Sequence, residues 1–308
     1  MSKTITVVGA GGYVGNALCR MLLDNFYSVR AYDNFHKGHC DSLISLSSSP
    51  RFHFEYGDVT NEDHVKQMVK DVDGIVNLAA IVGFPACSRC PSLAEITNVE
   101  GTRLLLKHKN DIPLVFASTG SVYGKVEDVC TEESPKNTNT IYGLTKWKAE
   151  QLVSEANNTV SFRFATGFGV SANMRVNLLV NDLVYQAIRN RSMCIFEADA
   201  RRTFIHVRDM ARAFIFGLEN IGKLEHKVYN AGDDKLNWTK RELCNYICEK
   251  TGAYVSYIDF AKDLDCRDYE VSYQKLNKAG FRCNIGMEEG IDELLRVVPL
   301  LQDRNPYA

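Results

Sequence analysis

The sequence predicts an α/β fold, in which a doubly wound parallel sheet is joined by a smaller mixed α/β lobe built from the C-terminal half. Two observations predict it. Short apolar, β-branched runs alternate with helical patterns through the first half of the chain, and a glycine-rich turn follows the first of these runs. Parallel strands that are buried on both faces have near-continuous apolar sequences, and each needs a crossover helix to reach its neighbour.

The alternation is regular up to residue 164. TITVV at Thr4–Val8 has the composition of a buried strand, and apolar residues at helical spacing follow it. A parallel sheet covered by helices on both faces follows from the repetition of this unit. Strands are expected at 4–8, 28–33, 52–56, 74–78, 114–117 and 160–164, and helices at 13–24, 61–70, 91–107 and 140–155.

The pattern loosens after Gly167. Strand-like runs at 203–207 and 227–229 flank a helical pattern at 209–218, and three further helices are expected at 239–251, 272–279 and 288–298. No low-complexity linker separates the two halves. We therefore expect two packed parts, a sheet domain formed by residues 1–168 with 203–231 and a lobe formed by residues 169–202 with 232–308.

Composition excludes several classes of protein. Of the 308 residues, 45% are hydrophobic and 24% charged, and the formal net charge is −2, so the basic surplus of a nucleic-acid-binding protein is missing. No run approaches the roughly 18 apolar residues that a membrane-spanning helix needs. The N-terminal apolar run breaks on glycines and does not resemble a signal peptide. We expect a cytoplasmic protein with neither a nucleic-acid nor a membrane partner.

The ten cysteines are expected to be buried or free thiols, because the sequence shows no secretory signal. Cys87 and Cys90 are the one close pair at metal-ligand or redox spacing, and no second such pair completes a zinc site. We expect no metal, and we favour a structural interpretation of Cys87 and Cys90.

Glycines at positions 9, 12 and 15 form a G-x-x-G-x-x-G motif between the first strand and the first helix. Gly9 permits a tight turn, Gly12 lets the backbone approach a pyrophosphate, and Gly15 lets the helix pack closely on the strand. Asp33 ends the second strand, where a carboxylate accepts hydrogen bonds from the ribose hydroxyls of adenosine and repels a 2′-phosphate. The motif predicts a Rossmann-type dinucleotide site that prefers NAD to NADP.

Residues at the ends of neighbouring strands extend this site. Asp58 follows the third strand, where it would accept from the adenine amino group, and the small residues after the fourth strand suit a backbone close to the cofactor. Plain packing is the alternative for both. The expected cofactor contacts are Gly9, Gly12, Tyr13, Val14, Gly15, Asp33, Asn34, Asp58, Val59, Leu78, Ala79, Ala80, Tyr142, Lys146 and Phe164.

Tyr142 and Lys146 stand four residues apart in a predicted helix and so share one face. A phenol of pKa about 10 is a poor base at neutral pH, but a nearby ammonium group and a positively charged nicotinamide favour the phenolate. Thr119 follows the fifth strand, at the carboxyl edge where ligands bind in this fold. We predict Thr119, Tyr142 and Lys146 as the catalytic residues, with Thr119 and Tyr142 bonding to the same substrate oxygen.

Together these motifs resemble those of the extended short-chain dehydrogenase/reductase family, and within it the nucleotide-sugar epimerases and dehydratases. The matching segments are GAGGYVG, NLAA, NVEGT, ASTGSVYG and YGLTK in the first half, and FRFATGFG, RRTFIHVRDMARA and VYNAG in the second. The resemblance covers nearly the whole chain. It implies NAD as the cofactor and a nucleotide-diphosphate sugar as the substrate, bound by the lobe of residues 169–202 with 232–308.

The resemblance also implies substrate contacts. Arg202 and Arg267 stand where the family places arginines on the substrate diphosphate, and Asn177 resembles a residue of the same region. Thr166 replaces the family's asparagine, and Phe164 replaces a common tyrosine. The expected substrate contacts are Val82, Thr119, Ser121, Thr166, Asn177, Arg202 and Arg267, whereas His206 and Asp209 are expected to be structural.

Two residues favour one of the candidate reactions over the others. Gly120 and Ser121 occupy the positions of the Asp-Glu pair that 4,6-dehydratases carry, so the resemblance favours a 4-epimerase that works through a transient 4-keto sugar. Nucleotide-sugar 4-dehydrogenases and 4-keto-sugar reductases, some of which act on heptoses for surface polysaccharides, use the same residues and stay open. A dinucleotide-sensing protein without catalysis is disfavoured, because such proteins usually lose the Tyr-Lys pair.

The resemblance further implies a homodimer built on the helices at 91–107 and 140–155. We expect their outer faces to be unusually apolar for solvated helices. The side chains concerned are Leu93, Ile96, Leu104, Trp147 and Leu152, which in the alternative interpretation all face the sheet.

Overall fold

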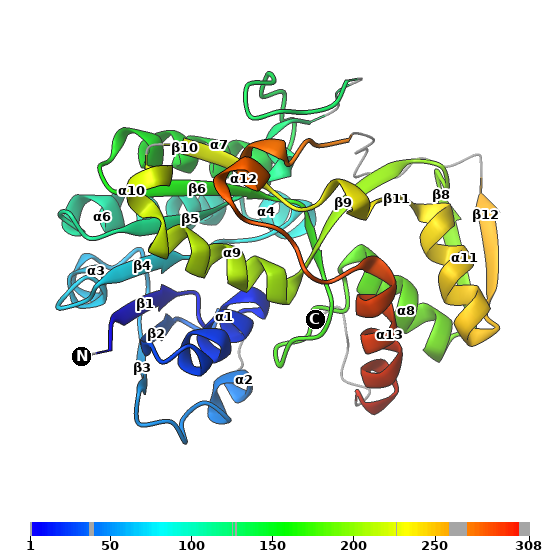
Figure 1. Cartoon of the computed structure of the whole chain (residues 1–308), viewed down its shortest axis with the longest axis horizontal. Helices are drawn as coiled ribbons and strands as arrows, with labels where there is room; N and C mark the ends of the chain where they lie inside the picture. Colours follow the sequence, from blue (N-terminus) through cyan, green and yellow to red (C-terminus); the bar gives the residue numbers. More distant parts are fainter. Residues whose placement is uncertain are drawn as a thin grey trace.

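The computed structural model describes residues 2–36, 40–124, 126, 128–225, 227–258 and 270–301. Figure 1 shows a large sheet flanked by helices and, beside it, a second group of helices and short strands that includes α8, α11 and α13. Among the helices of these described ranges, none combines the length and the apolar character needed to cross a membrane.

Seven parallel strands form the main sheet, in the order β10-β6-β5-β4-β1-β2-β3. From β1 the chain adds β2 and β3 on one side, then returns to place β4, β5 and β6 on the other, with Val7 of β1 opposite Ala31 and Val76. This order confirms the predicted doubly wound fold. The strands are β1 (Thr4–Val8), β2 (Ser28–Asp33), β3 (Phe52–Tyr56), β4 (Gly74–Asn77), β5 (Leu114–Thr119), β6 (Thr159–Phe164) and β10 (Lys227–Ala231).

Both faces of the sheet are buried, which explains the continuous apolar runs. Val7 and Val115 belong to the apolar core shared with α1 (Tyr13–Asp24) and α9 (Val207–Glu219). Their neighbours Val8 and Phe116 point to the opposite face. There the sheet is covered by α3 (Glu62–Met68), α6 (Gly101–His108) and α7 (Ile141–Glu155).

The helix expected at 91–107 is present but not uniform. It starts as α5 (Pro91–Glu95), passes through the π-helical segment η1 (Ile96–Glu100) and continues as α6. Within η1 the buried Asn98 accepts a hydrogen bond from the Ile81 N–H at 2.8 Å and donates one to Thr145 Oγ1 at 3.0 Å. The wider turn therefore accommodates a buried amide that ties the end of β4 to α7, a contact that helical periodicity does not reveal.

A short helix that no sequence pattern predicted, α4 (Phe84–Arg89), precedes α5. Its Cys87 is buried and donates a hydrogen bond from Sγ to the Ile81 carbonyl at 3.2 Å, whereas Cys90 is exposed. Among the described residues, no group of three or more His, Cys, Asp or Glu side chains is placed to hold a metal ion.

The second group of elements has its own apolar core. The strand expected at 203–207 belongs to a three-stranded sheet of order β11-β9-β7, and β12 pairs with β8. The division into two lobes at the stated boundaries stays a prediction. These strands are β7 (Thr166–Phe168), β8 (Ser192–Phe196), β9 (Arg201–His206), β11 (Asn237–Thr239) and β12 (Tyr254–Ile258), and the main helices are α8 (Leu179–Arg189), α11 (Lys240–Thr251) and α13 (Met287–Val297).

His206 and Asp209 are buried and make internal contacts. Asp209 accepts hydrogen bonds from the backbone N–H groups of Asn284 and Ile285, each at 3.0 Å from Oδ2. His206 Nε2 lies 3.1 Å from Glu293 on α13, and burial, aided by the charge of Arg208, lowers the pKa of His206 to about 3. The remaining short elements are α2 (Asp41–Ile44), α10 (Ile221–Leu224), α12 (Gln274–Ala279), η2 (Gly120–Val122), η3 (Asp234–Leu236) and η4 (Val298–Leu300).

Candidate active site

The glycine-rich turn lies against the end of β4 and leaves no room for side chains. Gly9 has a φ angle of 87°, and a Cβ atom there would lie 2.9 Å from the backbone nitrogen of Ala79. A Cβ on Gly15 would overlap the Gly9 carbonyl oxygen and lie 2.8 Å from Cα of Ala10. Gly12 caps α1 without a side-chain hydrogen bond, and the first turn of α1 holds no acidic residue. The first N–H groups of α1 therefore suit a diphosphate.

The segment after β7 covers the other side of this turn. Ser171 donates a hydrogen bond from Oγ to the Tyr13 carbonyl at 2.7 Å, and Asn173 donates one to the Gly11 carbonyl at 2.6 Å. The Tyr13 hydroxyl in turn donates to the Gly169 carbonyl at 2.7 Å. The predicted cofactor turn is thus held in place by hydrogen bonds to residues more than 150 positions away, which local sequence patterns do not show.

The acidic residues expected near adenosine, Asp33 at the end of β2 and Asp58 shortly after β3, each accept hydrogen bonds from neighbouring groups. Asp33 accepts from the N–H of Gly11 at 2.9 Å and from the N–H of Phe35 at 2.8 Å. Burial raises the pKa of Asp33 above its usual value, although these N–H donors act against the rise. Asn34 donates to Asp58 Oδ2 at 3.0 Å. Asp33 therefore joins the glycine turn to β2 and places a carboxylate beside it.

The side chains of the other expected cofactor contacts differ in how far they are exposed to solvent. Leu78, Ala79 and Ala80 are partly exposed in the segment after β4, and so is Val82, an expected substrate contact. Val14, also partly buried, packs against the main core at the start of α1. By contrast, Val59 and Phe164 have buried side chains, Val59 in the core beneath α6 and Phe164 against Phe214 with ring centroids 4.9 Å apart. For these last two, the backbone is the part that can face a cofactor.

We expect the native protein to bind NAD at least about tenfold more tightly than NADP, a difference of roughly 1.4 kcal/mol. Asp33→Ala should narrow this gap, because it removes the carboxylate that repels a 2′-phosphate. Titration of both dinucleotides into the native protein, Asp33→Ala and the control Asp24→Ala, an exposed aspartate at the end of α1, measures the effect.

Equal binding of the two dinucleotides by the native protein would contradict this expectation and point to Arg30 or Lys37 as a phosphate ligand. Arg30 is already engaged, because its Nη1 donates to the Lys70 carbonyl at 2.6 Å. Lys37 lies outside the described residues.

The predicted catalytic residues come from the end of β5 and the start of α7. Thr119 Oγ1 accepts from the N–H of Ser121 at 3.1 Å and lies 3.2 Å from Ser121 Oγ. A Cβ atom on Gly143 would lie 2.9 Å from the Ser121 carbonyl oxygen. The turn that holds Thr119 and Ser121 is therefore in contact with the helical turn that holds Tyr142.

Lys146 is almost fully buried, with 2% of its surface exposed. Its ammonium nitrogen lies 4.0 Å from the centroid of the Phe116 ring, a cation–π contact. Burial lowers the pKa of Lys146 to about 7, with Glu150 and Cys87 acting in the opposite direction. An amine that titrates near neutral pH, one helical turn from Tyr142, suits a site that moves protons.

Sequence reasoning missed Arg175, in the segment between β7 and α8. Burial lowers the pKa of Arg175, whereas Tyr142 and Tyr13 raise it, which means that the guanidinium acts on both phenols. Its Nε lies 3.4 Å from Oδ1 of Asn177. The sequence feature that could have pointed to Arg175 is its position two residues before Asn177, which is an expected substrate contact. The structure thus adds a second cation near Tyr142.

The expected substrate contacts are only partly assembled in the described chain. Asn177 is exposed beside Arg175, and Thr166 begins β7. Arg202 is buried on β9 and donates from Nη1 to the Arg201 carbonyl at 3.1 Å. Arg267 lies outside the described residues, so the structure describes one of the two predicted diphosphate arginines.

Comparison with known proteins agrees with this geometry. The sequence matches the NAD dependent epimerase/dehydratase family over residues 5–232. UDP-glucose 4-epimerase 2 of Arabidopsis thaliana is 25% identical over 100% of this chain and 97% of its own. The low-salt glycan biosynthesis protein Agl12 of Haloferax volcanii is 27% identical over 94% of this chain and 96% of its own.

A solved structure supports the same fold. UDP-glucuronic acid 4-epimerase from Bacillus cereus, crystallised with UDP-glucuronic acid and NAD, has a TM-score of 0.86 and 23% identity, over 97% of this chain and 100% of that chain. The family match spans the glycine turn, Thr119, Tyr142 and Lys146. The start of α1, with a glycine at its N-cap and no acidic residue in its first turn, fits the diphosphate of a dinucleotide. The chain therefore belongs to the NAD-dependent epimerase/dehydratase family, as an enzyme of the extended short-chain dehydrogenase/reductase type with NAD as its cofactor.

Proposed function

We propose that this enzyme is a 4-epimerase of a nucleotide-diphosphate sugar. The observation that carries the proposal is the turn after β5, where Thr119 and Ser121 present hydroxyls and Gly120 presents no side chain. Elimination of water across C5 and C6 of a sugar needs an acid and a base at that place. The turn lacks both, whereas it has the hydroxyl groups that can hold the oxygen at C4.

The proposed reaction needs few side chains of this protein, and each has its own role. Bound NAD supplies a hydride acceptor and, once reduced, a hydride donor. Tyr142 takes the proton of the C4 hydroxyl and returns it, while Thr119 holds the same oxygen. Arg175 interacts electrostatically with Tyr142, and Lys146 stands four residues after Tyr142 on α7, so each cation favours the phenolate form. The buried Lys146 and the Tyr142 of the same helix face favour catalysis over dinucleotide binding alone.

The test is to incubate the enzyme with UDP-, GDP-, dTDP- and CDP-sugars, to follow the absorbance of NADH and to determine the configuration of the product at C4. A product inverted at C4 without net NADH is the expected result. Stoichiometric NADH would instead identify a 4-dehydrogenase, and consumption of NADH with a 4-keto sugar would identify a reductase. Tyr142→Phe serves as the inactive control.

Arg202 is proposed to hold the substrate diphosphate. Its guanidinium is buried on β9, and buried cations suit phosphate oxygens that must leave water. Arg202→Ala should raise the Michaelis constant for the nucleotide sugar at least about tenfold, or roughly 1.4 kcal/mol, with NAD affinity nearly unchanged.

The matched control is Arg201→Ala. Arg201 is exposed and paired with Glu270 at 3.1 Å, so its removal should change the Michaelis constant far less. Thermal melting of both variants separates a binding defect from unfolding. An Arg202→Ala enzyme that is folded and has a native Michaelis constant would exclude this role.

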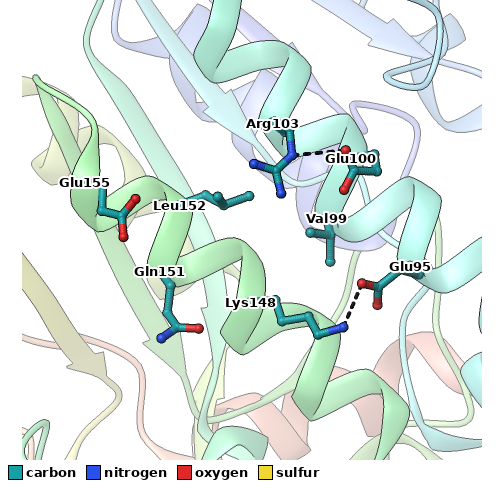
Figure 2. A pocket seen from close by; sticks show the side chains of 8 residues that line it. All are labelled: Glu95, Val99, Glu100, Arg103, Lys148, Gln151, Leu152 and Glu155. Carbon is teal, nitrogen blue, oxygen red and sulfur yellow. Dashed lines mark hydrogen bonds and ion pairs between the residues drawn. The ribbon is translucent and has the colours of Figure 1, made fainter.

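We also propose a homodimer that buries the surface formed by α5, η1 and α7. Leu93 and Ile96 are exposed there, by 36% and 47%. Leu152 lines a groove of about 420 Å³ in the same surface, and Figure 2 shows the Lys148–Glu95 ion pair, 2.7 Å long, across it. Leu104 and Trp147 instead pack partly against the cores, so the apolar surface is smaller than the sequence suggested.

Light scattering at micromolar concentration is expected to give the mass of a dimer. Ile96→Glu should produce monomers, because it buries a carboxylate in the proposed interface. Ile44→Glu, a change at an isoleucine 62% exposed elsewhere on the surface, is the control and should leave the dimer intact. A native protein with the mass of a monomer would refute the proposal.

A further inference from the structure

A buried carboxylate that the proposed chemistry does not use lies one helical turn beyond Lys146. Glu150 is 3% exposed. Its Oε1 lies 2.6 Å from Nη2 of Arg163 on β6, and its Oε2 accepts from Ser118 Oγ at 2.6 Å. We propose that Glu150 is a positioning residue for catalysis, which fixes α7 against the end of β5 and keeps a negative charge beside the Lys146 ammonium group.

The positions of these groups in the chain support a positioning role. Ser118 directly precedes Thr119, so the carboxylate is bonded to the neighbour of one predicted catalytic residue. On α7, residues 142, 146 and 150 recur every four positions and share one face of the helix. One carboxylate thus links the strand end that carries Thr119 to the helix face that carries Tyr142 and Lys146.

The ion pair is stabilised by a hydrogen-bonded network. Arg163 also donates from Nη1 to the Tyr123 hydroxyl at 2.9 Å and to the Glu132 carbonyl at 3.1 Å. The Tyr123 hydroxyl donates to Asn230 Oδ1 at 2.6 Å on β10. Two buried charges are tolerated where such additional bonds satisfy them. The network also limits the freedom of Glu150, whose carboxylate is held from β5 and from β6.

The charge of Glu150 matters because of what else faces Lys146. Phe116 on β5 presents a ring, Cys87 on α4 a thiol, and α7 itself contributes Glu150. Tyr142 stands four residues before Lys146 on the same face of α7. Burial raises the pKa of Cys87 to about 11, so this thiol is neutral at working pH. Burial lowers the pKa of Lys146, and Glu150 acts against it. Glu150 is therefore the carboxylate that helps Lys146 to stay protonated near neutral pH.

The titration of Lys146 tests this role without any sugar substrate. Lysine labelled with ¹³C at Cε gives an NMR signal that Lys146→Met identifies by its loss. In Glu150→Gln the titration midpoint of Lys146 should fall by at least about one pH unit, because the stabilising charge is removed. Glu155→Gln, the same change at an exposed glutamate of α7, is the matched control and should leave the midpoint in place.

Glu150→Gln leaves Arg163 buried without its partner and could unfold the protein. Glu150→Gln combined with Arg163→Gln replaces the ion pair by two neutral amides, and the midpoint should fall in this variant too. Glu150→Asp keeps the charge and should keep the midpoint within a few tenths of a unit of the native value. An unchanged midpoint in a folded Gln variant overturns the proposal, and so does failure of both Gln variants to fold, which would reduce Glu150 to a stability residue.

The catalytic consequence rests on the proposed function, whereas the effect on Lys146 does not. In Glu150→Gln, turnover should fall at least about tenfold near neutral pH with little change in the Michaelis constant, and the alkaline decline of activity should move to lower pH. Glu150→Asp should recover part of the turnover. If no nucleotide sugar is converted while the midpoint still shifts, the proposed function fails and the role of Glu150 stands. If the enzyme is active but Glu150→Gln shifts neither the titration midpoint of Lys146 nor the pH profile of turnover, only the proposed role of Glu150 fails.

Discussion

Tyr142→Phe is expected to lower turnover at least about a hundredfold, the usual scale for loss of a general acid–base group. The substitution removes only the hydroxyl and keeps the ring in the first turn of α7. Folding and NAD binding should therefore be unchanged, since the glycine turn and Asp33 are untouched. The measurements are the turnover of the nucleotide sugar, the affinity for NAD and the melting temperature.

The control for Tyr142→Phe is Tyr254→Phe, at a tyrosine that is 71% exposed on β12 of the second lobe. It removes the same atom from the surface and should have no effect on turnover. Near-native turnover by Tyr142→Phe would exclude the phenol from the proton transfer. In that case Lys146, which titrates near neutral pH, would be the remaining candidate on this face of α7.

Gly15→Ala is expected to damage the cofactor site. The new methyl group would overlap the Gly9 carbonyl oxygen and press on Ala10, both of which are backbone groups that cannot turn away. Overpacking of this kind costs about 1–3 kcal/mol, and here the strain falls on the turn that faces the diphosphate. NAD affinity should fall at least about tenfold, and the melting temperature should fall as well.

Gly222→Ala is the matched control, because a Cβ atom at Gly222 on α10 meets no atom within 4 Å. Alanine favours helices over glycine, so this control should leave stability unchanged or slightly higher. Isothermal titration of NAD into both variants and the native protein measures the difference. Native NAD affinity in Gly15→Ala would show that the turn does not bind the diphosphate as proposed.

Much of the sheet could be predicted because its strands are buried on both faces. The predicted bounds at 4–8, 28–33 and 52–56 are those of β1, β2 and β3. An apolar run that is buried from both sides is a local signal, and the spacing of the three glycines is local as well, although Gly9 packs against Ala79 in the segment after β4. The order of the strands came from the structure, because crossover helices are compatible with more than one order.

The short elements of the second lobe could not be predicted in the same way. β7 has three residues and pairs with β9, with Thr166 opposite Phe204. β12 pairs with β8 although β9, β10, β11 and the helices α9, α10 and α11 lie between them in the chain. A strand of three residues, such as β7, carries too few residues for a periodic pattern. Their pairing depends on the packing of α8, α11 and α13 around a shared core.

The sequence by itself determined the doubly wound sheet, the cofactor turn and the Tyr142–Lys146 pair, because each depends on residues close together in the chain. Only the tertiary structure decided which groups surround them. Arg175 acts on Tyr142, Asn173 bonds to the glycine turn, and Glu150 reaches β5 and β6. These contacts join segments that lie far apart in sequence, and burial lowers the pKa of Lys146 while Glu150 acts against it. Contacts between distant segments and the depth at which a side chain is buried leave no pattern in the local sequence. This is the physical reason why only the tertiary structure could reveal them.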